Sequence, residues 1–198
     1  MPLPRDVHIS EEQRTRILAA APIGLRLQVL LCSDLALRQG SAMKLTPDNY
    51  NRDRHTLYIT GKAGSRYELP ATEEIEHLLN AAWPSKDGCA TPYLQLLAGG
   101  RAASRSYWQK QWRVVREKLA LPRDIRPHDL RRTTAVRALE TTGDIRIVQE
   151  LLGHRSLSTT TRYLQQHLTR LTPAVLNQIK EGTKWQSGFP SRARSTPK

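Results

Sequence analysis

The sequence predicts a mainly helical α+β fold with a small antiparallel β-sheet or hairpin. Apolar residues recur at helical spacing in most segments of the chain. One stretch instead places strand-type residues on both sides of a Gly-containing turn. The 198 residues are enough for one domain, or for two small ones, with a substantial buried core.

Two helices are expected first. Ser10 and Gln13 form the pattern of a capping box, which predicts a helix that runs to about Ala21. A second helix is expected to run to about Leu37, and it is too apolar to lie at the surface. It should form the core through Leu25, Leu27, Val29, Leu30 and Leu31.

A β-hairpin is expected in "HTLYITGKAGSRYELP", residues 55–70. Strand-type residues at 57–59 and at 67–69 flank the turn "TGKAGS". This arrangement puts Lys62 at or near the tip of the hairpin.

Two further helices are indicated before residue 120. Thr72 can cap a helix whose first turn carries Glu73 and Glu74, where carboxylates suit the helix dipole. Another helix has an apolar stripe and an opposite basic face, and we interpret the stripe as core rather than as a surface on which bases stack. The stripe comprises Trp108, Trp112, Val115 and Leu119, and the basic face comprises Lys110, Arg113, Arg116 and Lys118.

Three helices are expected between residues 127 and 164. Pro127 suits the first position of a helix that ends near Gly143. Asp144 can cap a short helix that ends at Gly153, and Ser158 can cap the third helix.

These helices carry an unusual set of polar side chains. His128 and Arg131 are spaced i and i+3, on one face of a first helical turn. His154 follows a helix terminus, and Tyr163 comes nine residues later. Each alone is explained by ordinary packing or solvation, but a globular core rarely needs so many cationic donors beside a Tyr.

The composition indicates a polyanionic partner. Lys and Arg number 31 against 18 Asp and Glu, so the formal net charge is +13, and the excess is spread along the chain. Without an apolar run of about 18 residues or a signal-peptide pattern, no membrane partner is expected. Cys32 and Cys89 support neither a disulfide framework nor a Cys-rich zinc site. We expect a cytoplasmic, nucleoid-associated protein.

Four stretches in this order resemble the catalytic domain of the tyrosine recombinases, or phage integrases, over residues 10 to 180. They are "ALRQGSAMKLT", "GKAGSRYELP", "HDLRRTTA" and "VQELLGHRSLSTTTRYL". Each motif is weak by itself, but the ordered set is specific. By this resemblance the catalytic residues are Arg38, Lys62, His128, Arg131, His154 and Tyr163 as the nucleophile.

The resemblance implies cleavage and rejoining of double-stranded DNA without metal, ATP or another cofactor. Planar guanidinium groups, here Arg38 and Arg131, can stabilise the charge that develops on the phosphate oxygens. Tyr163 needs a proton acceptor because the reference pKa of tyrosine is near ~10, and His128 is implied in this role. Lys62 would protonate the departing 5′ oxygen, and the product would be a 3′-phosphotyrosyl link.

Two positions depart from the usual pattern of the family. Ser41 stands where an acidic residue often follows the first Arg, and Ala36 stands where Gly commonly precedes it. We expect residues 1–9 to be a lead-in, 10–182 the catalytic domain and 183–198 a basic, disordered tail. The N-terminal helical domain of most members is expected to be absent from this sequence.

Other functions remain as alternatives. A type IB topoisomerase would use similar chemistry to relax supercoils, and a noncatalytic DNA-binding module would need only the charge. A metal-dependent transposase or nuclease is disfavoured because no carboxylate cluster stands out. Self-association on DNA, in a synaptic assembly, remains open.

Overall fold

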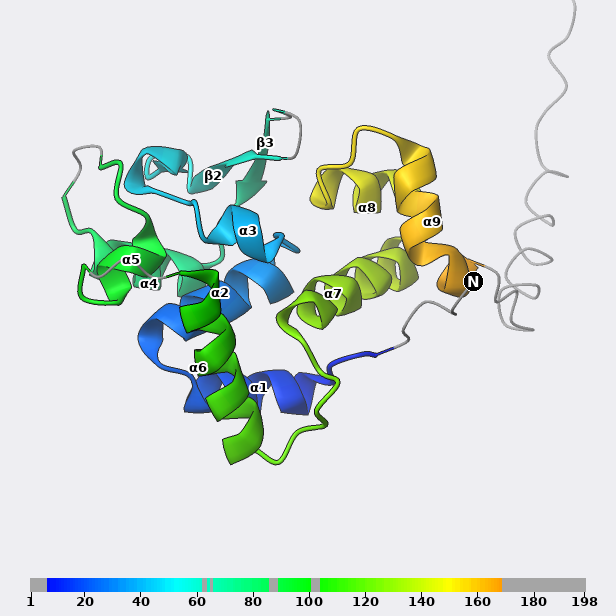
Figure 1. Cartoon of the computed structure of the whole chain (residues 1–198). Coiled ribbons are helices and arrows are strands. Elements are labelled where there is room, and N and C mark those ends of the chain that lie inside the picture. Colours follow the sequence, from blue (N-terminus) through cyan, green and yellow to red (C-terminus); the bar gives the residue numbers. More distant parts are fainter. Residues whose placement is uncertain (1–6, 62–63, 65, 86–88, 101–103, 169–198) are drawn as a thin grey trace, which may run out of the picture. The chain divides into compact units, whose positions relative to one another are not determined.

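The computed structural model describes residues 7–61, 64, 66–85, 89–100 and 104–168. The predicted mainly helical α+β class is confirmed (Figure 1). The elements, in chain order, are α1 (Glu11–Ala20), α2 (Ile23–Ser33), α3 (Gln39–Ala42), η1 (Pro47–Asn49), β1 (Tyr50–Asn51), β2 (Thr56–Thr60), β3 (Arg66–Pro70), α4 (Glu73–Ala82), α5 (Tyr93–Leu97), α6 (Arg105–Lys118), α7 (Pro127–Thr142), α8 (Ile145–Leu151) and α9 (Leu157–Leu168).

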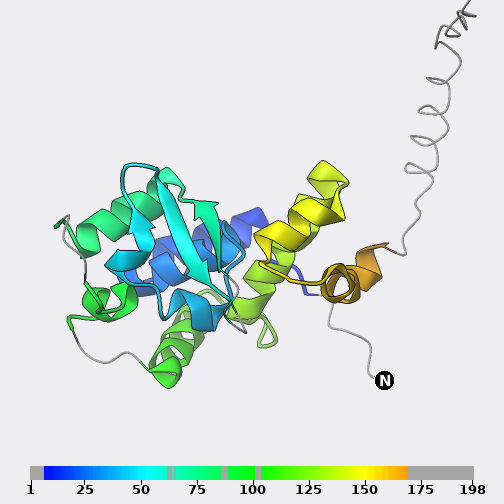
Figure 2. The ribbon, with the colours of Figure 1, turned by 90° about the horizontal axis from the view of Figure 1, so that it is seen from above.

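Helix α2 is the centre of the packing. It contacts α1 and the helices from α3 to α7, and most of its side chains are buried. The three strands form an antiparallel sheet of order β1-β2-β3, which lies over α2 and α3 (Figure 2). In the β2–β3 hairpin, Leu57 is opposite Leu69 and Ile59 is opposite Tyr67.

The buried residues form two hydrophobic clusters. The larger cluster joins α1, α2, the sheet, α4, α5 and α6, and it contains the predicted stripe residues Trp108, Trp112 and Val115. The smaller cluster joins α7, α8 and α9 with Ala36, and Tyr163 packs against it. The sequence-predicted Tyr163 therefore lies beside a small core that the last three helices form.

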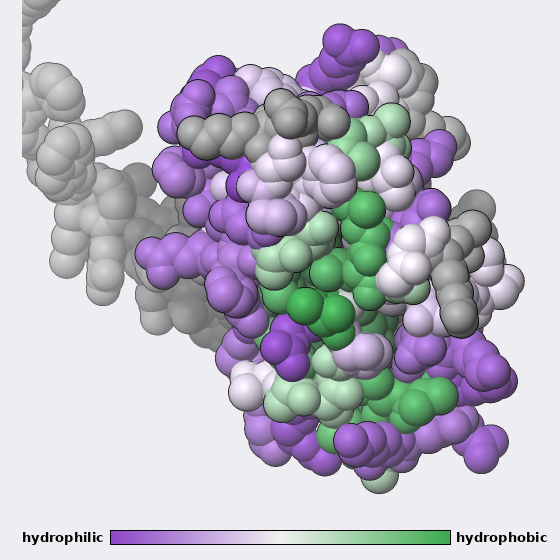
Figure 3. Space-filling view, turned by 90° about the vertical axis from the view of Figure 1, so that its left-hand side faces the viewer, coloured by the Kyte–Doolittle hydropathy of each residue, from purple (hydrophilic) through white to green (hydrophobic). Residues whose placement is uncertain are grey.

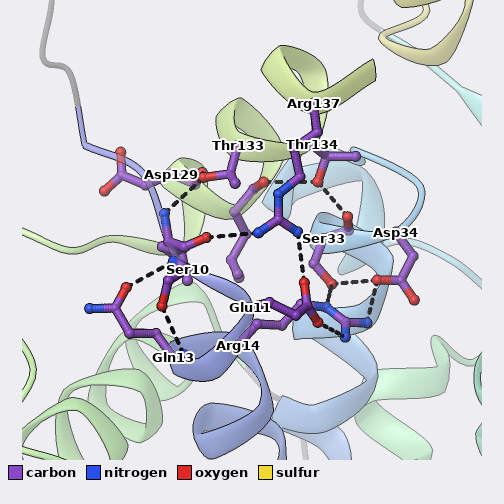
Figure 4. Close-up of polar contacts among 12 residues, drawn as sticks. Ser10, Glu11, Gln13, Arg14, Ser33, Asp34, Asp129, Thr133, Thr134 and Arg137 are labelled. Atoms are coloured by element: carbon purple, nitrogen blue, oxygen red, sulfur yellow. Dashed lines mark hydrogen bonds and ion pairs between the residues drawn. The ribbon is translucent and has the colours of Figure 1, made fainter. Parts of the chain in front are cut away.

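A polar network ties the start of the chain to α2 and α7 (Figure 4). Arg14 Nη2 pairs with Asp34 at 2.6 Å, and Arg14 Nε donates to Ser33 Oγ at 3.0 Å. Glu11 accepts from Arg14 at 3.0 Å and from Arg137 of α7 at 2.7 Å. Helix α7 is thus fixed relative to the end of α2.

The second predicted helix ends earlier than expected. Helix α2 stops at Ser33, not near Leu37, and Ala36 has a φ of +49°, in the left-handed region. The Leu37 amide donates to Leu31 O at 2.9 Å, while the Ala36 carbonyl accepts from Arg131. A local partner, Leu31, and a tertiary partner, Arg131, therefore satisfy backbone groups that a longer helix would have paired, and Ala36 adopts the φ that glycine adopts freely.

The other expectations have mixed outcomes. The capping box of Ser10 and Gln13 is confirmed, and so are the caps by Thr72 and Asp144. Ser158 does not cap α9, because this helix begins at Leu157 and Ser158 lies in its first turn. Strand β1, α3, η1 and α5 were not predicted, since each is too short to show a periodic pattern.

The surface on the side where α4 and α5 lie carries an apolar band between hydrophilic side chains (Figure 3). Large apolar side chains that stay exposed include that of Ile23, at 43%. Among the described residues, no helix combines the length and the apolar character that crossing a membrane requires.

Candidate active site

The first turn of α7 fixes two of the predicted residues. Pro127 is at the first helical position, and Asp129 Oδ2 accepts from the Arg126 amide at 2.8 Å, which closes a capping box. The helix start is therefore well defined, and it places His128 and Arg131 one turn apart.

Arg131 lies where three segments of the chain meet. Its side chain is buried, with 2% of the residue exposed. Nη1 donates to the carbonyl of Ala36, and Nη2 donates to Leu152 O at 3.0 Å and lies 3.4 Å from His154 Nε2. The Arg131 guanidinium thus joins three segments, which are the loop before Arg38, helix α7 and the turn between α8 and α9.

His154 is held on both sides of its ring. It follows Gly153, whose φ of +58° reverses the chain after α8. Its Nδ1 is 3.0 Å from the hydroxyl of Thr160, which is fully buried. Because a guanidinium only donates, Nε2 faces Arg131 as an acceptor and Nδ1 carries the proton that Thr160 accepts.

Charge and burial keep His154 neutral. Desolvation, followed by the nearby charges of Arg131 and Arg38, lowers its pKa to about 4. At neutral pH the imidazole is therefore uncharged in this structure.

Tyr163 lies between the two histidines. Its ring centroid is 6.1 Å from that of His128 and 6.1 Å from that of His154, each in an edge-on arrangement. The hydroxyl is buried, and burial raises its pKa although the Arg131 guanidinium beside it acts in the opposite direction. The phenol therefore keeps its proton at neutral pH.

His128 is exposed at its outer face, and its inner face meets Tyr163. Desolvation by surrounding protein and the charge of Arg131 lower its pKa, against a raising effect of Asp129. A neutral imidazole thus stands beside a protonated phenol, as a proton acceptor would.

Arg38 belongs to the same electrostatic cluster. It is half-buried at the N-cap position of α3, and its charge lowers the pKa of Arg131, His128 and His154. It lines a cavity of about 620 Å³ together with Ser41 and Gly61. Lys62, which follows Gly61, lies outside the described residues.

Sequence reasoning missed three residues that shape this site. The ring of Tyr67 on β3 lies against Gly153, Thr160 holds His154, and Ala36 accepts from Arg131. Tyr67 and Thr160 gave no chemical signal, because a Tyr in a strand and a Thr in a helix are ordinary. Ala36 did give a signal, since it stands where Gly commonly occurs in the family.

A cationic groove of about 770 Å³ opens beside His128. Helix α6 forms one wall, which includes Trp112, and the buried Trp108 and Val115 pack into the core. The basic residues of the groove are Arg105, Lys110, Arg113, Arg116 and Arg126.

In the part of the chain that the structure describes, no group of three or more His, Cys, Asp or Glu residues is placed to hold a metal ion. Arg38 and Arg131 supply the positive charge that converges at this site.

Comparison with known proteins shows the family to which the chain belongs. Residues 8–170 match the model of the phage integrase family. Tyrosine recombinase XerC of Rhodospirillum centenum is 35% identical over 172 residues, which cover 82% of this chain and 50% of that protein. The chain spans about half the length of such relatives.

Solved structures share the fold. XerA recombinase superposes with a TM-score of 0.68 at 22% identity, covering 98% of this chain and 68% of that one. XerH site-specific recombinase bound to its difH substrate has a TM-score of 0.66 at 22% identity, covering 91% and 55%. The expected recombinase catalytic-domain fold is therefore confirmed.

Proposed function

Because the chain belongs to the phage integrase family, we propose that residues 10–182 cleave and rejoin double-stranded DNA in site-specific recombination. The observation that carries the proposal is the position of Tyr163, whose ring lies between His128 and His154 and whose buried hydroxyl has no hydrogen-bond partner among the described residues. Few other reactions need a tyrosine hydroxyl, two neutral imidazoles and two neighbouring guanidinium groups together.

Arg38 and Arg131 bind the phosphate that is cleaved. Their fixed guanidinium forks donate to its nonbridging oxygens and stabilise the charge that develops as a fifth ligand approaches phosphorus. Burial, followed by the charge of Arg38, lowers the pKa of Arg131, which supports this role because two like charges held close together favour an anion between them.

Tyr163 supplies the nucleophile. Its oxygen forms a bond to phosphorus while the bond from phosphorus to the 5′ oxygen breaks, and the phenol proton passes to His128. Lys62 donates a proton to the departing 5′ oxygen. The 3′-phosphotyrosyl link conserves the bond energy, so that a 5′ hydroxyl can reseal the strand without ATP or a metal ion.

His154 completes the phosphate site. In this structure its Nε2 accepts from Arg131, so it donates to a phosphate only after Nε2 gains a proton. A bound phosphate raises the pKa of the imidazole through its negative charge, which promotes this change.

Duplex DNA fits the charge distribution beside the site. The groove along α6 carries several exposed cations next to His128. The neighbour XerH is bound to its difH substrate, which supports DNA as the partner of the shared fold. Because strand exchange joins two sites, self-association on DNA is part of the proposal.

The test is incubation with a nicked suicide duplex in excess chelator, followed by a denaturing gel. We expect a covalent protein–DNA adduct, and Arg131→Lys should reduce its rate of formation strongly while thermal unfolding checks that this variant folds. Salt-sensitive binding without an adduct would instead indicate a noncatalytic DNA-binding module. Relaxation of supercoils without dependence on sequence would indicate a type IB topoisomerase.

A further inference from the structure

The backbone and the ring of His154 are held by different partners. Its amide donates to Gln149 O at 3.0 Å, and its carbonyl accepts from Gln149 Nε2 at 2.9 Å. The ring is held from α9 instead, because Nδ1 lies 3.0 Å from the hydroxyl oxygen of Thr160. The Gln149 contacts therefore fix the turn, whereas the Thr160 contact fixes the rotation of the imidazole.

Thr160 makes this contact from the helix that carries the nucleophile. It precedes Tyr163 by three residues, so the two side chains lie on one face of α9. Thr160 is fully buried, so bulk water does not compete for its hydroxyl. The next residue, Thr161, is exposed, and its hydroxyl donates to Leu157 O at 3.0 Å within the helix. Of these two neighbouring threonines, the buried one meets the histidine.

The Thr160 hydroxyl can accept from Nδ1 whether His154 is neutral or charged. In this structure Nε2 lies 3.4 Å from Arg131 Nη2, which only donates, so the proton of the neutral ring is on Nδ1. When Nε2 also gains a proton and donates to a phosphate, Nδ1 keeps its own proton and Thr160 still accepts it. The imidazole therefore needs no rotation between the two states.

We propose that Thr160 is a positioning residue, whose hydroxyl accepts from Nδ1 of His154 and thereby directs Nε2 to the place where the DNA phosphate binds. The inference rests on the proposed function and gives α9 a second role beside carrying Tyr163. Because Thr160 and Tyr163 share one helix, any shift of α9 moves the nucleophile and the partner of the histidine together.

The variant Thr160→Val replaces the hydroxyl by a methyl group and keeps the branched shape of the side chain. With the nicked suicide duplex at neutral pH under single-turnover conditions, we expect adduct formation to slow by on the order of 10-fold, as for loss of a hydrogen bond to a charged group. Thr160→Ser keeps the hydroxyl and should restore most of the rate. The matched control is Thr161→Val, which removes an exposed hydroxyl of the same helix and should react at the wild-type rate.

The pH dependence distinguishes positioning of His154 from a merely structural role. A hydrogen bond to the charged form raises the pKa of a histidine, so loss of the Thr160 acceptor should lower the pKa of His154 in the DNA complex. The defect of Thr160→Val should therefore be smallest in mild acid and should grow as the pH rises. Arg131, Arg38 and Tyr163, which also face His154, are the same in both proteins and cancel in the ratio of rates.

A double-mutant cycle shows whether Thr160 acts through His154. If it does, Thr160→Val should slow the His154→Ala protein by less than about twofold. A separate measurement needs no DNA, because NMR of isotope-labelled histidine detects the proton on Nδ1. That signal should be protected from exchange in the wild type and in Thr161→Val, and it should be lost in Thr160→Val.

The outcomes separate this inference from the proposed function. A wild-type adduct together with a wild-type rate for Thr160→Val would overturn the inference alone. So would a defect that is the same at every pH, that persists in His154→Ala or that tracks a lower unfolding temperature. A neutral His154 with its proton on Nε2 in the free protein would overturn it as well. If the wild-type protein forms no adduct, the proposed function fails and the inference fails with it.

Discussion

Tyr163 and His128 form a pair whose protonation states suit proton transfer from the phenol. Burial raises the pKa of the phenol, so the free protein holds an unactivated nucleophile. Desolvation and Arg131 lower the pKa of His128, which leaves its imidazole able to accept a proton at neutral pH. The arginine that we propose to bind the phosphate therefore also helps burial to keep the acceptor uncharged.

Stability should fall in mild acid because of His154. Its pKa is about 4 in the folded protein, below the ordinary 6.5, so the unfolded chain binds the proton first as the pH falls. The free energy of unfolding should thus decrease from about pH 6.5 towards pH 4. In His154→Gln this decrease should be smaller than in the wild type. We expect the difference to be on the order of 1 kcal/mol, because solvent screens a partly exposed ring. Urea titrations at several pH values measure it, and parallel pH profiles would argue against the assignment.

Lys62 can be tested as the general acid through the leaving group. Lys62→Ala should slow cleavage by on the order of 10² to 10⁴-fold, because the 5′ oxygen then leaves without a proton. A bridging sulfur at that position leaves without needing a proton, so the variant should recover most of its rate. Arg131→Lys should stay slow on both substrates, because the transition-state charge remains poorly supported. Equal defects of Lys62→Ala on the two substrates would assign the proton to another group.

At the scale of elements, the sequence predicted helix starts correctly where they depend on neighbouring residues. The capping box at Ser10, the Thr72 cap and the Pro127 start each depend on side chains within one turn, and each is confirmed. The end of α2 depends instead on Arg131, 95 residues further along the chain from Ala36. The spacing of apolar residues along α2 carries no information about that distant contact. The helix predicted from the sequence was therefore too long.

The junction between α1 and α2 should respond to loss of one charge. Asp34→Asn leaves the partly buried Arg14 without its charged partner at 2.6 Å, and we expect a loss of about 1–3 kcal/mol in the free energy of unfolding. Glu12→Gln is the matched control, since its pair with Arg16 spans 3.9 Å between exposed side chains and should contribute below about 0.5 kcal/mol. Denaturant unfolding of the two variants gives the comparison, and equal losses would contradict it.

At the scale of the whole molecule, the site forms where segments far apart in sequence meet. The order of motifs predicted which residues belong together, and the described structure brings His128, Arg131, His154 and Tyr163 into contact, with Arg38 in electrostatic range. The sequence could not predict that Tyr67 joins them. Its contact with Gly153 arises from how the hairpin packs on the α8–α9 turn, which is a tertiary property.

The net charge of +13 predicts DNA binding that is steeply dependent on salt. Each phosphate that the protein neutralises should contribute about 0.9 to the slope of log affinity against log salt for duplex DNA. Arg113→Gln in the α6 groove should lower that slope by about 0.9, the contribution of one phosphate contact. Arg16→Gln on α1, outside the groove, should leave the slope unchanged. Fluorescence anisotropy across a salt series measures both slopes. Equal slopes for wild type and Arg113→Gln would place the DNA elsewhere.

The most direct test of the central claim is to locate the covalent bond. After reaction with the nicked suicide duplex, the adduct is digested with a protease and a nuclease, and the modified peptide is sequenced by mass spectrometry. We predict a nucleotide remnant on Tyr163 and none on Tyr67, and the Tyr163→Phe protein should bind the duplex normally but form no adduct. A remnant on any other residue, or an adduct that persists in Tyr163→Phe, would contradict the account.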